Sequence, residues 1–463
     1  MNFLKKIFSP TILTISFLLL LYTFYKSEIV WDGYNRNYYK TYYLISSILI
    51  CFSIITFFIK DEIKQYLIIS GISLIVSLYL FEGYLTFKEQ LSKDQLSKEQ
   101  LSKEQLLKKQ LYEKQTGNKW DTRNKLEIYK ELKKNNKEIT VFFAPSYLLG
   151  KNYHTDIFSL SGLSNSETIY CNENGYYSIY QSDRYGFNNP DNEWDKKEIE
   201  YLLVGDSFTH GACVNRPNDI SSVLRNLSNK SVLNLGMDGN GPLIEYATLR
   251  EYLNTKVKKV LWFYYEGNDL GNLNNEIKNN ILINYINDLN FTQNLKFKQN
   301  ENNEFLKKIL IEVEIKITNE ELNYNKKNKK IKYKILKFIR LNKTKKIIKK
   351  PLLNNSEENN SEEIDNIKKI LTLSRDLVIK NNSKLYFVYL PEYIRYKKTY
   401  DNKNYNLVKN IVTELKIPFI DIHKEVFKKE QNPLKLFPFE LYGHYNVDGY
   451  KKVAGTIYKF TKD

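Results

Sequence analysis

The sequence predicts an α/β domain with a doubly wound, parallel sheet of about five strands, preceded by N-terminal transmembrane helices and a helical stalk. Three observations carry this prediction. The second half of the chain alternates apolar runs with helical patterns, the N-terminal part holds three uncharged segments, and a pentapeptide repeat lies between. A chain of 463 residues exceeds one ordinary core. We place the boundaries at 1–86 for a membrane anchor, 87–118 for the stalk, 119–197 for a lead-in α+β subdomain and 198–463 for the α/β domain.

The N-terminal segments 11–25, 41–59 and 66–81 contain no charged residue. Each is long enough, or nearly so, to cross a hydrocarbon core that needs ~20 residues, which predicts three transmembrane helices. Lys5 and Lys6 favour a cytoplasmic N-terminus, which places everything after the third crossing outside the cytoplasm. Basic residues in both connecting loops leave the opposite orientation open. We expect the inner (cytoplasmic) membrane, with the α/β domain on the periplasmic side.

Residues 88–112 form a pentapeptide repeat of the type Lys-Glu-Gln-Leu-Ser. Its residues are mostly good helix formers, and acidic residues stand four positions before lysines, as Glu104 does before Lys108. A five-residue spacing turns each leucine by ~140° from the last, so the leucines scatter around the helix axis. The repeat therefore favours a solvated helical stalk over a coiled coil.

The region after the stalk has a globular pattern. A helix at 121–137, a strand at 139–144 and a hairpin at 169–186 are expected for the lead-in subdomain. Apolar strands that alternate with helical patterns then follow at 201–204, 232–235, 260–265, 385–390 and 419–422. This alternation predicts a parallel sheet, whose ligands lie at the carboxyl ends of the strands.

Polar groups follow the ends of these strands. The first strand runs into Gly205-Asp206-Ser207, where a serine at a strand-to-helix turn has its hydroxyl at the carboxyl edge of the sheet. The same tripeptide is also ordinary turn chemistry. The second strand runs into a glycine-rich loop that includes Gly239, and the third runs into Gly267-Asn268-Asp269. His444 stands in a loop just before a final helix, where a base is needed.

These four blocks, in this order and on these elements, resemble the SGNH (GDSL-type) hydrolase superfamily across roughly residues 198–463, the insertion excluded. The resemblance implies a flavodoxin-like fold, and together with the three apolar N-terminal segments it suggests a membrane-anchored bacterial member of the superfamily. It implies Ser207 as the nucleophile and His444 as its general base and acid. It also implies an oxyanion hole formed by the Ser207 N–H, the Gly239 N–H and the Asn268 amide. No cofactor is expected.

The group that orients the histidine departs from the superfamily pattern. An aspartate usually stands three residues before the histidine, and here that position is Leu441. Glu440, one residue further back, is the candidate orienting acid, and the alternative is a Ser-His pair oriented by a backbone carbonyl. His210, one turn past Ser207, is a competing base, although its place on the same helix favours a position at the rim.

The positive charge is concentrated in one region. The formal net charge is +17, and an insertion at about 271–360 contains residues 325–350, with thirteen Lys or Arg and no acidic residue. Interleaved apolar residues suit an amphipathic helix on anionic lipid headgroups, and a solvated basic helix is an equal alternative. No nucleic-acid motif accompanies the charge, so nucleic acid is not expected as a partner.

The three cysteines, Cys51, Cys171 and Cys213, fit no zinc spacing, so no metal is expected. The last two either form a disulfide between the lead-in hairpin and the nucleophile turn or remain free thiols.

Together these features indicate a membrane-tethered serine ester hydrolase or O-acyltransferase, and they favour acetyl esters of an envelope glycan as its substrate. The alternatives are a lipid esterase or thioesterase, and a non-catalytic scaffold in envelope assembly. The expected substrate is accordingly an acylated glycan or a lipid.

Overall fold

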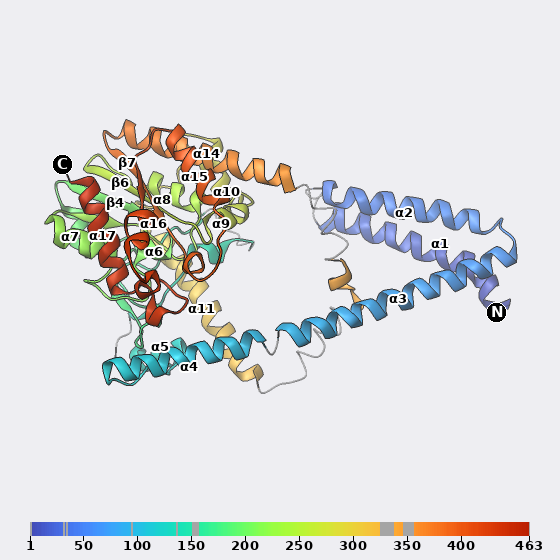
Figure 1. The fold of residues 1–463 in the computed structure, drawn as a ribbon. Helices are drawn as coiled ribbons and strands as arrows, with labels where there is room; N and C mark the ends of the chain where they lie inside the picture. Colours follow the sequence, from blue (N-terminus) through green and yellow to red (C-terminus); the bar gives the residue numbers. More distant parts are fainter. Residues whose placement is uncertain are drawn as a thin grey trace. The chain divides into compact units, whose positions relative to one another are not determined.

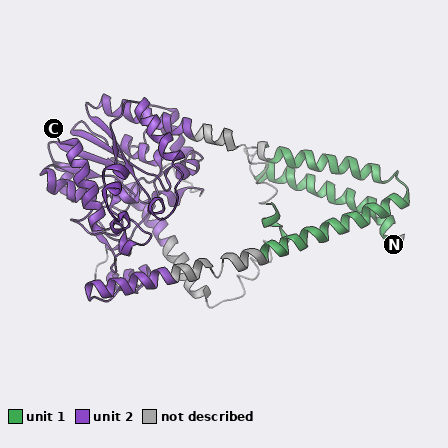
Figure 2. Cartoon of the chain, in the orientation of Figure 1, with its two compact units in different colours: residues 1–96, 328–353 green, residues 97–327, 354–463 purple. Residues whose placement is uncertain are grey.

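The computed structural model describes residues 2–30, 33, 36–93, 96–135, 138–150, 157–324, 338–345 and 356–462 (Figure 1). The chain forms two compact units, one of residues 1–96 and 328–353 and the other of residues 97–327 and 354–463 (Figure 2). The backbone therefore passes from the first unit to the second after residue 96, and returns to the first unit within the predicted insertion.

The first unit contains three long apolar helices, α1 (Asn2–Phe24), α2 (Arg36–Thr56) and α3 (Asp61–Lys93). A π-helical stretch, η1 (Tyr25–Val30), extends α1. All three helices are long and apolar enough to cross a membrane, and most of their apolar side chains are exposed. An apolar exterior of this kind is compatible with a lipid environment.

Part of the basic insertion packs against α3. The ring of Phe338 lies 5.8 Å from that of Tyr79. The buried Glu82 carboxylate accepts hydrogen bonds from the backbone N–H groups of Lys343 and Thr344, at 3.0 and 2.8 Å. The predicted amphipathic helix over 325–350 falls largely outside the described residues, which include only 338–345 of it. Within these residues Leu341 has a left-handed φ of 49°, and a turn at 340–341 interrupts the helical backbone.

The second unit is built on a five-stranded parallel sheet with the order β5-β4-β6-β7-β8. Its strands lie where the apolar runs predicted them, at β4 (Ile199–Val204), β5 (Val232–Asn234), β6 (Val257–Tyr265), β7 (Lys384–Leu390) and β8 (Phe419–Asp421). The expected doubly wound α/β fold is confirmed. Since β4 lies between β5 and β6, the loops that follow these two strands flank the residues that follow β4.

Helices cover both faces of this sheet (Figure 1). They are α7 (Ile220–Ser228), α8 (Pro242–Tyr252), α9 (Asp269–Glu276), α10 (Asn280–Asn287), α11 (Gln299–Tyr324), α14 (Ser356–Lys380), α15 (Lys403–Glu414), α16 (Ile422–Glu425) and α17 (Val447–Thr461). Alternate strand residues enter different cores. Trp262 belongs to the cluster that includes residues of α8, α10 and α14, whereas Phe263 belongs to the cluster that includes residues of α7 and α17. Burying a large apolar side chain of this kind contributes about 1.5–3 kcal/mol to the free energy of folding.

The predicted insertion begins as part of the core. Leu282 and Tyr285 of α10 and Leu306 of α11 are fully buried in the core cluster that also contains Trp262. On the return, α14 buries Ile367 and Ile370 in the same cluster. The two ends of the insertion are therefore held firmly in the second unit.

The lead-in subdomain contains α5 (Lys125–Lys133) and a small sheet of β1 (Thr140–Val141), β2 (Glu167–Ile169) and β3 (Ile179–Gln181). Asn124 and Glu127 form a capping box that fixes the start of α5. The antiparallel pair of β2 and β3 forms the expected hairpin, and its connection spans residues 170–178. This connection extends toward the carboxyl edge of the large sheet through Cys171, which is bonded to Cys213.

The pentapeptide repeat is helical in the end of α3 and in α4 (Leu96–Thr116). The carboxyl-terminal half of α4 differs from a fully solvated stalk, because it packs against the loop before α17. Lys108 Nζ donates a hydrogen bond to the Tyr442 carbonyl oxygen at 2.6 Å. Leucine spacing did not reveal this contact, since charged side chains and a backbone make it.

Candidate active site

The turn after β4 places Ser207 at the carboxyl edge of the sheet. Asp206 caps the short helix α6 (Ser207–His210), because its carboxylate accepts the Phe208 N–H at 2.9 Å. Gly205 permits the tight approach of strand and helix, since a Cβ there would lie 2.1 Å from Thr209 Oγ1. Ser207 is thus the first residue of a rigid, buried turn.

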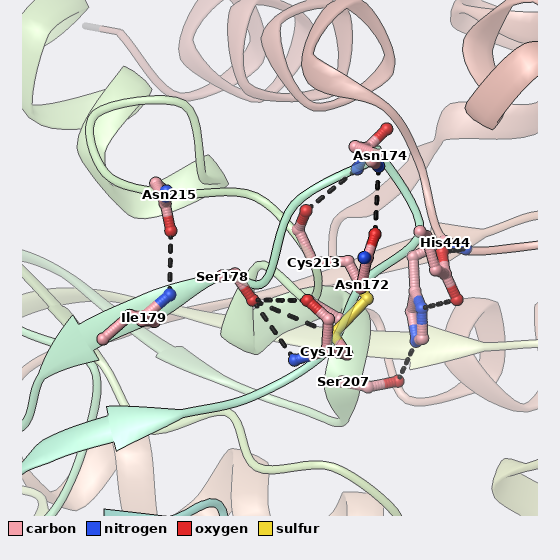
Figure 3. The surroundings of a disulfide bond; sticks show 12 residues. Cys171, Asn172, Asn174, Ser178, Ile179, Ser207, Cys213, Asn215 and His444 are labelled. Atoms are coloured by element: carbon pink, nitrogen blue, oxygen red, sulfur yellow. Dashed lines mark hydrogen bonds and ion pairs between the residues drawn. A yellow bond between two sulfur atoms is a disulfide. The ribbon is translucent and has the colours of Figure 1, made fainter. Parts of the chain in front are cut away.

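His444 and Ser207 lie within hydrogen-bonding distance although 237 residues separate them, as Figure 3 shows. The distance from His444 Nε2 to Ser207 Oγ is 2.9 Å. On the other side of the ring, His444 Nδ1 lies 3.1 Å from Glu173 Oε1. Because a carboxylate only accepts, Nδ1 carries the proton, and Nε2 is left to accept the Ser207 hydroxyl proton.

Glu173 is a site residue that the sequence did not predict. It lies in the connection between β2 and β3, and its Oε2 also accepts the backbone N–H of His444 at 2.7 Å. The carboxylate therefore fixes both the ring and the backbone of the histidine. The sequence signal closest to it was Cys171, two residues earlier.

The electrostatics of this pair are coupled. Burial lowers the pKa of His444, but the adjacent Glu173 carboxylate outweighs burial and the net direction is upward. Burial raises the pKa of Glu173, and the charge and hydrogen bonds of His444 reverse that direction, so Glu173 stays ionised. An ionised carboxylate beside the ring stabilises the imidazolium that forms during proton transfer.

Glu440, the expected orienting acid, does not contact the histidine. Its carboxylate accepts a hydrogen bond from Asn432 Nδ2 at 3.0 Å. Phe439 and Glu440 both adopt left-handed backbone conformations, with φ of 56° and 60°, which turn the loop away from a regular path before His444. Closeness in sequence therefore did not translate into contact, and Glu173 occupies the position expected for Glu440.

His210 does not act as a competing base in this geometry. Its ring is buried, its Nδ1 lies 3.1 Å from the Gly236 carbonyl oxygen, and the rings of Phe142, Tyr170 and Tyr180 surround it edge-on. Burial lowers the pKa of His210 to about 4, so the ring stays neutral. It is a packed core histidine behind the nucleophile turn.

The expected oxyanion-hole residues lie in the loops that flank Ser207. Gly239 follows β5 with a φ of 74°, a conformation that favours glycine. Asn268 follows β6, immediately before α9, and its side chain makes no capping hydrogen bond. Asn268 Oδ1 is buried and has no hydrogen-bond partner among the described residues. The loops thus bring both residues to the edge where Ser207 lies.

A disulfide joins Cys171 to Cys213, with a Cα–Cα distance of 5.0 Å, and lies beside Ser207 and His444 in Figure 3. Asn174 Nδ2 donates a second link, to the Cys213 carbonyl oxygen at 2.9 Å. The bond connects the Glu173 segment to the end of the nucleophile turn. It also occupies the Cys213 sulfur, which would otherwise complete a trio of potential metal ligands with Glu173 and His444.

The fold and site define an α/β protein with a hydrogen-bonded serine, histidine and glutamate at the carboxyl edge of a parallel sheet. No family model and no curated protein matches the chain. Among solved structures, one from Desulfitobacterium hafniense DCB-2, described as a candidate lipolytic protein of the G-D-S-L family, matches with 12% identity and a TM-score of 0.30. The match covers 57% of this chain and 99% of that one. So distant a likeness carries no argument about function, which is inferred from the site.

Proposed function

We propose that this protein is a membrane-tethered serine ester hydrolase or O-acyltransferase of the SGNH (GDSL-type) superfamily, acting on acetyl esters of an envelope glycan. The observation that carries the proposal is the relay from Glu173 through His444 to Ser207, with distances of 3.1 and 2.9 Å. A serine hydroxyl becomes nucleophilic when an oriented, neutral imidazole can take its proton. This arrangement meets that requirement.

The reaction follows from the positions of these groups. His444 Nε2 takes the Ser207 proton as Oγ attacks the ester carbonyl carbon. The tetrahedral oxyanion accepts hydrogen bonds from the Ser207 N–H, the Gly239 N–H and the Asn268 amide. The intermediate collapses as His444 returns the proton to the departing alcohol, which leaves an acyl ester on Ser207. Water then discharges the acyl group in a hydrolase, or a sugar hydroxyl accepts it in a transferase, with His444 again moving the proton.

We propose the extracytoplasmic side for the second unit. The bond between Cys171 and Cys213 supports this placement, since structural disulfides persist in oxidising compartments and are rare in the cytosol. The lysine signal at the N-terminus favours the same side. An envelope glycan is then the ester-bearing material that a membrane-anchored domain meets.

The alternatives receive less support. A lipid esterase needs an apolar groove beside the nucleophile. The structure has a largely apolar cavity of about 1070 Å³ bounded by α5, β1 and α11, but neither Ser207 nor His444 lines it. A non-catalytic scaffold was suggested by the missing aspartate at Leu441, and Glu173 supplies the acid that this position lacks.

Labelling of the full-length protein in detergent with a fluorophosphonate probe tests for an activated serine. We expect labelling of wild type and none of Ser207→Ala, and unlabelled wild type would contradict the enzyme proposal. Acetyl release from acetylated envelope polysaccharide, compared with release of fatty acid from phospholipid, tests the substrate class. Preferential release of fatty acid would replace the glycan with a lipid substrate. Adding an unacetylated oligosaccharide acceptor separates transfer from hydrolysis.

A further inference from the structure

The stalk helix α4 holds the backbone of the loop that carries His444. Lys108 Nζ donates to the Tyr442 carbonyl oxygen at 2.6 Å, and Glu104 Oε1 accepts the Tyr442 N–H at 3.2 Å. Glu104 and Lys108 lie one turn apart on the same face of the helix. Together they satisfy both backbone polar groups of a single residue, two positions before the histidine.

Aromatic contacts extend this interface. The Tyr112 ring meets the Phe439 ring edge-on, with centroids 6.2 Å apart, and Trp120 lies 6.1 Å from Phe439. Tyr112 also packs on Gly175, where a Cβ would lie 2.5 Å from the tyrosine ring. Gly175 belongs to the same short connection as Glu173. The helix therefore contacts both segments that build the relay to Ser207.

The loop needs external support. Phe439 and Glu440 are held in left-handed conformations that residues with a Cβ rarely adopt, and such conformations persist only where neighbouring groups impose them. Tyr442 is 56% exposed, so packing of its own side chain constrains the loop weakly. The contacts from α4 supply constraint at this point in the loop.

Lys108 also acts on the acid of the site. The pKa of Glu173 is raised by burial and lowered by His444, and the positive charge of Lys108 adds to the lowering. Lys108 therefore has two roles: its ammonium bonds the Tyr442 carbonyl oxygen, and its charge favours the ionised form of Glu173.

We propose that Glu104 and Lys108 are positioning residues for catalysis. They keep His444 in register with Ser207 and Glu173, so that the helix that follows the membrane anchor completes the active site. The inference rests on the proposed function, because it assigns a role in the same reaction. It also assigns a function to the last part of the pentapeptide repeat.

The test compares the full-length double variant Glu104→Ala/Lys108→Ala with wild type in detergent, using hydrolysis of a chromogenic acetyl ester. We expect kcat to fall about ten- to a hundredfold while KM changes little, since small misplacement of a catalytic group has effects of this size. The midpoint of the acidic limb of the pH profile should also fall, because His444 is no longer held against Glu173. Gln105→Ala/Gln110→Ala, which alters two exposed residues of the same helix, is the matched control and should behave as wild type.

Conservative replacements of Glu104 and Lys108 distinguish a positioning role from a general effect on protein stability. Glu104→Gln and Lys108→Arg retain an acceptor and a donor, and the variant with both changes should recover most of kcat and the pH midpoint. A wild-type kcat and pH profile in the double alanine variant would overturn the proposal, as would a loss of activity that tracks thermal stability alone. Ser207→Ala, measured alongside, distinguishes this failure from failure of the proposed function, which would leave Ser207→Ala as active as wild type.

Discussion

Glu173 accepts hydrogen bonds from both the ring Nδ1 and the backbone N–H of His444, across 271 residues of sequence. A single carboxylate thereby fixes the tautomer of the ring and the position of the loop that carries it. The acid of the site therefore comes from the lead-in subdomain and not from a loop that follows a strand of the large sheet.

Replacing each glutamate by glutamine should show which of Glu173 and Glu440 supports catalysis. Glu173→Gln removes the charge that stabilises the imidazolium, and we expect kcat on an acetyl ester to fall by about 10²- to 10⁴-fold. Glu440→Gln is the control, because its side chain contacts Asn432 and not the histidine, and it should stay within about twofold of wild type. Equal losses in the two variants would refute the assignment of Glu173.

The pH profile should report the raised pKa of His444. Catalysis needs the neutral ring, so kcat/KM should rise with pH and reach half its maximum above 6.5, the ordinary value for histidine. Glu173→Gln should move this midpoint to lower pH. Asp206, whose pKa burial raises to about 6, titrates nearby, and its charge also raises the pKa of His444. Because Glu173 contributes more to that rise, Asp206→Asn should lower the midpoint less than Glu173→Gln does, and the reverse order would argue against assigning the limb to the His444–Glu173 pair.

Loss of the disulfide should weaken both the fold and the site. Cys171→Ser/Cys213→Ser should lower the free energy of unfolding by about 2–4 kcal/mol, as expected when a cross-link no longer restricts the unfolded chain. It should also slow fluorophosphonate labelling of Ser207, because the Glu173 segment loses its link to the nucleophile turn. Reductant should slow the labelling of wild type in the same way and should not change the labelling rate of Cys171→Ser/Cys213→Ser. Equal labelling rates in all samples would show that the bond does not support the site.

Substitution of Gly239 should be unfavourable for two reasons that can be measured separately, a steric clash and a strained backbone conformation. Gly239→Ala places a Cβ 2.4 Å from Ser146 Oγ and imposes a φ of 74° on alanine, at a cost of about 1–3 kcal/mol. We expect lower thermal stability and a lower kcat. Adding Ser146→Gly removes the steric clash but leaves the backbone strain, so it should restore only part of the loss. Complete restoration would mean that the conformation of Gly239 is unimportant.

Lipid contact by the basic insertion is a further proposal. Arg340 and Lys345 are exposed in the segment that Glu82 fixes to α3. Native mass spectrometry of the full-length protein should show fewer retained anionic phospholipids in Arg340→Glu/Lys345→Glu than in wild type. Lys114→Glu/Lys119→Glu changes the charge equally on exposed residues elsewhere and serves as the control. Equal retention by all three proteins would argue for a solvated basic segment.

The sequence predicted those parts of the fold that local patterns determine. The strands of the large sheet are buried on both faces, so each appeared as a short apolar run, and the Gly-Asp-Ser turn follows directly from one of them. His444 was found through its place before the last helix. These features can be predicted without knowing which remote segments of the chain contact one another.

The rest of the site depends on contacts between remote segments. Glu173 carries no local motif, and its role arises only when the hairpin meets the loop before α17. Glu440 was favoured by its closeness to His444, but left-handed residues redirect the chain there. The contact between α4 and Tyr442 was hidden because one partner is backbone, which leaves no trace in the choice of side chain.

The bond between Cys171 and Cys213 also bears on when the proposed enzyme would become active. If the second unit lies outside the cytoplasm, as proposed, the disulfide forms only after export, and until then the Glu173 segment lacks its covalent link to the turn that carries Ser207. Full activity would then coincide with export, and esters in the cytoplasm would be spared premature cleavage.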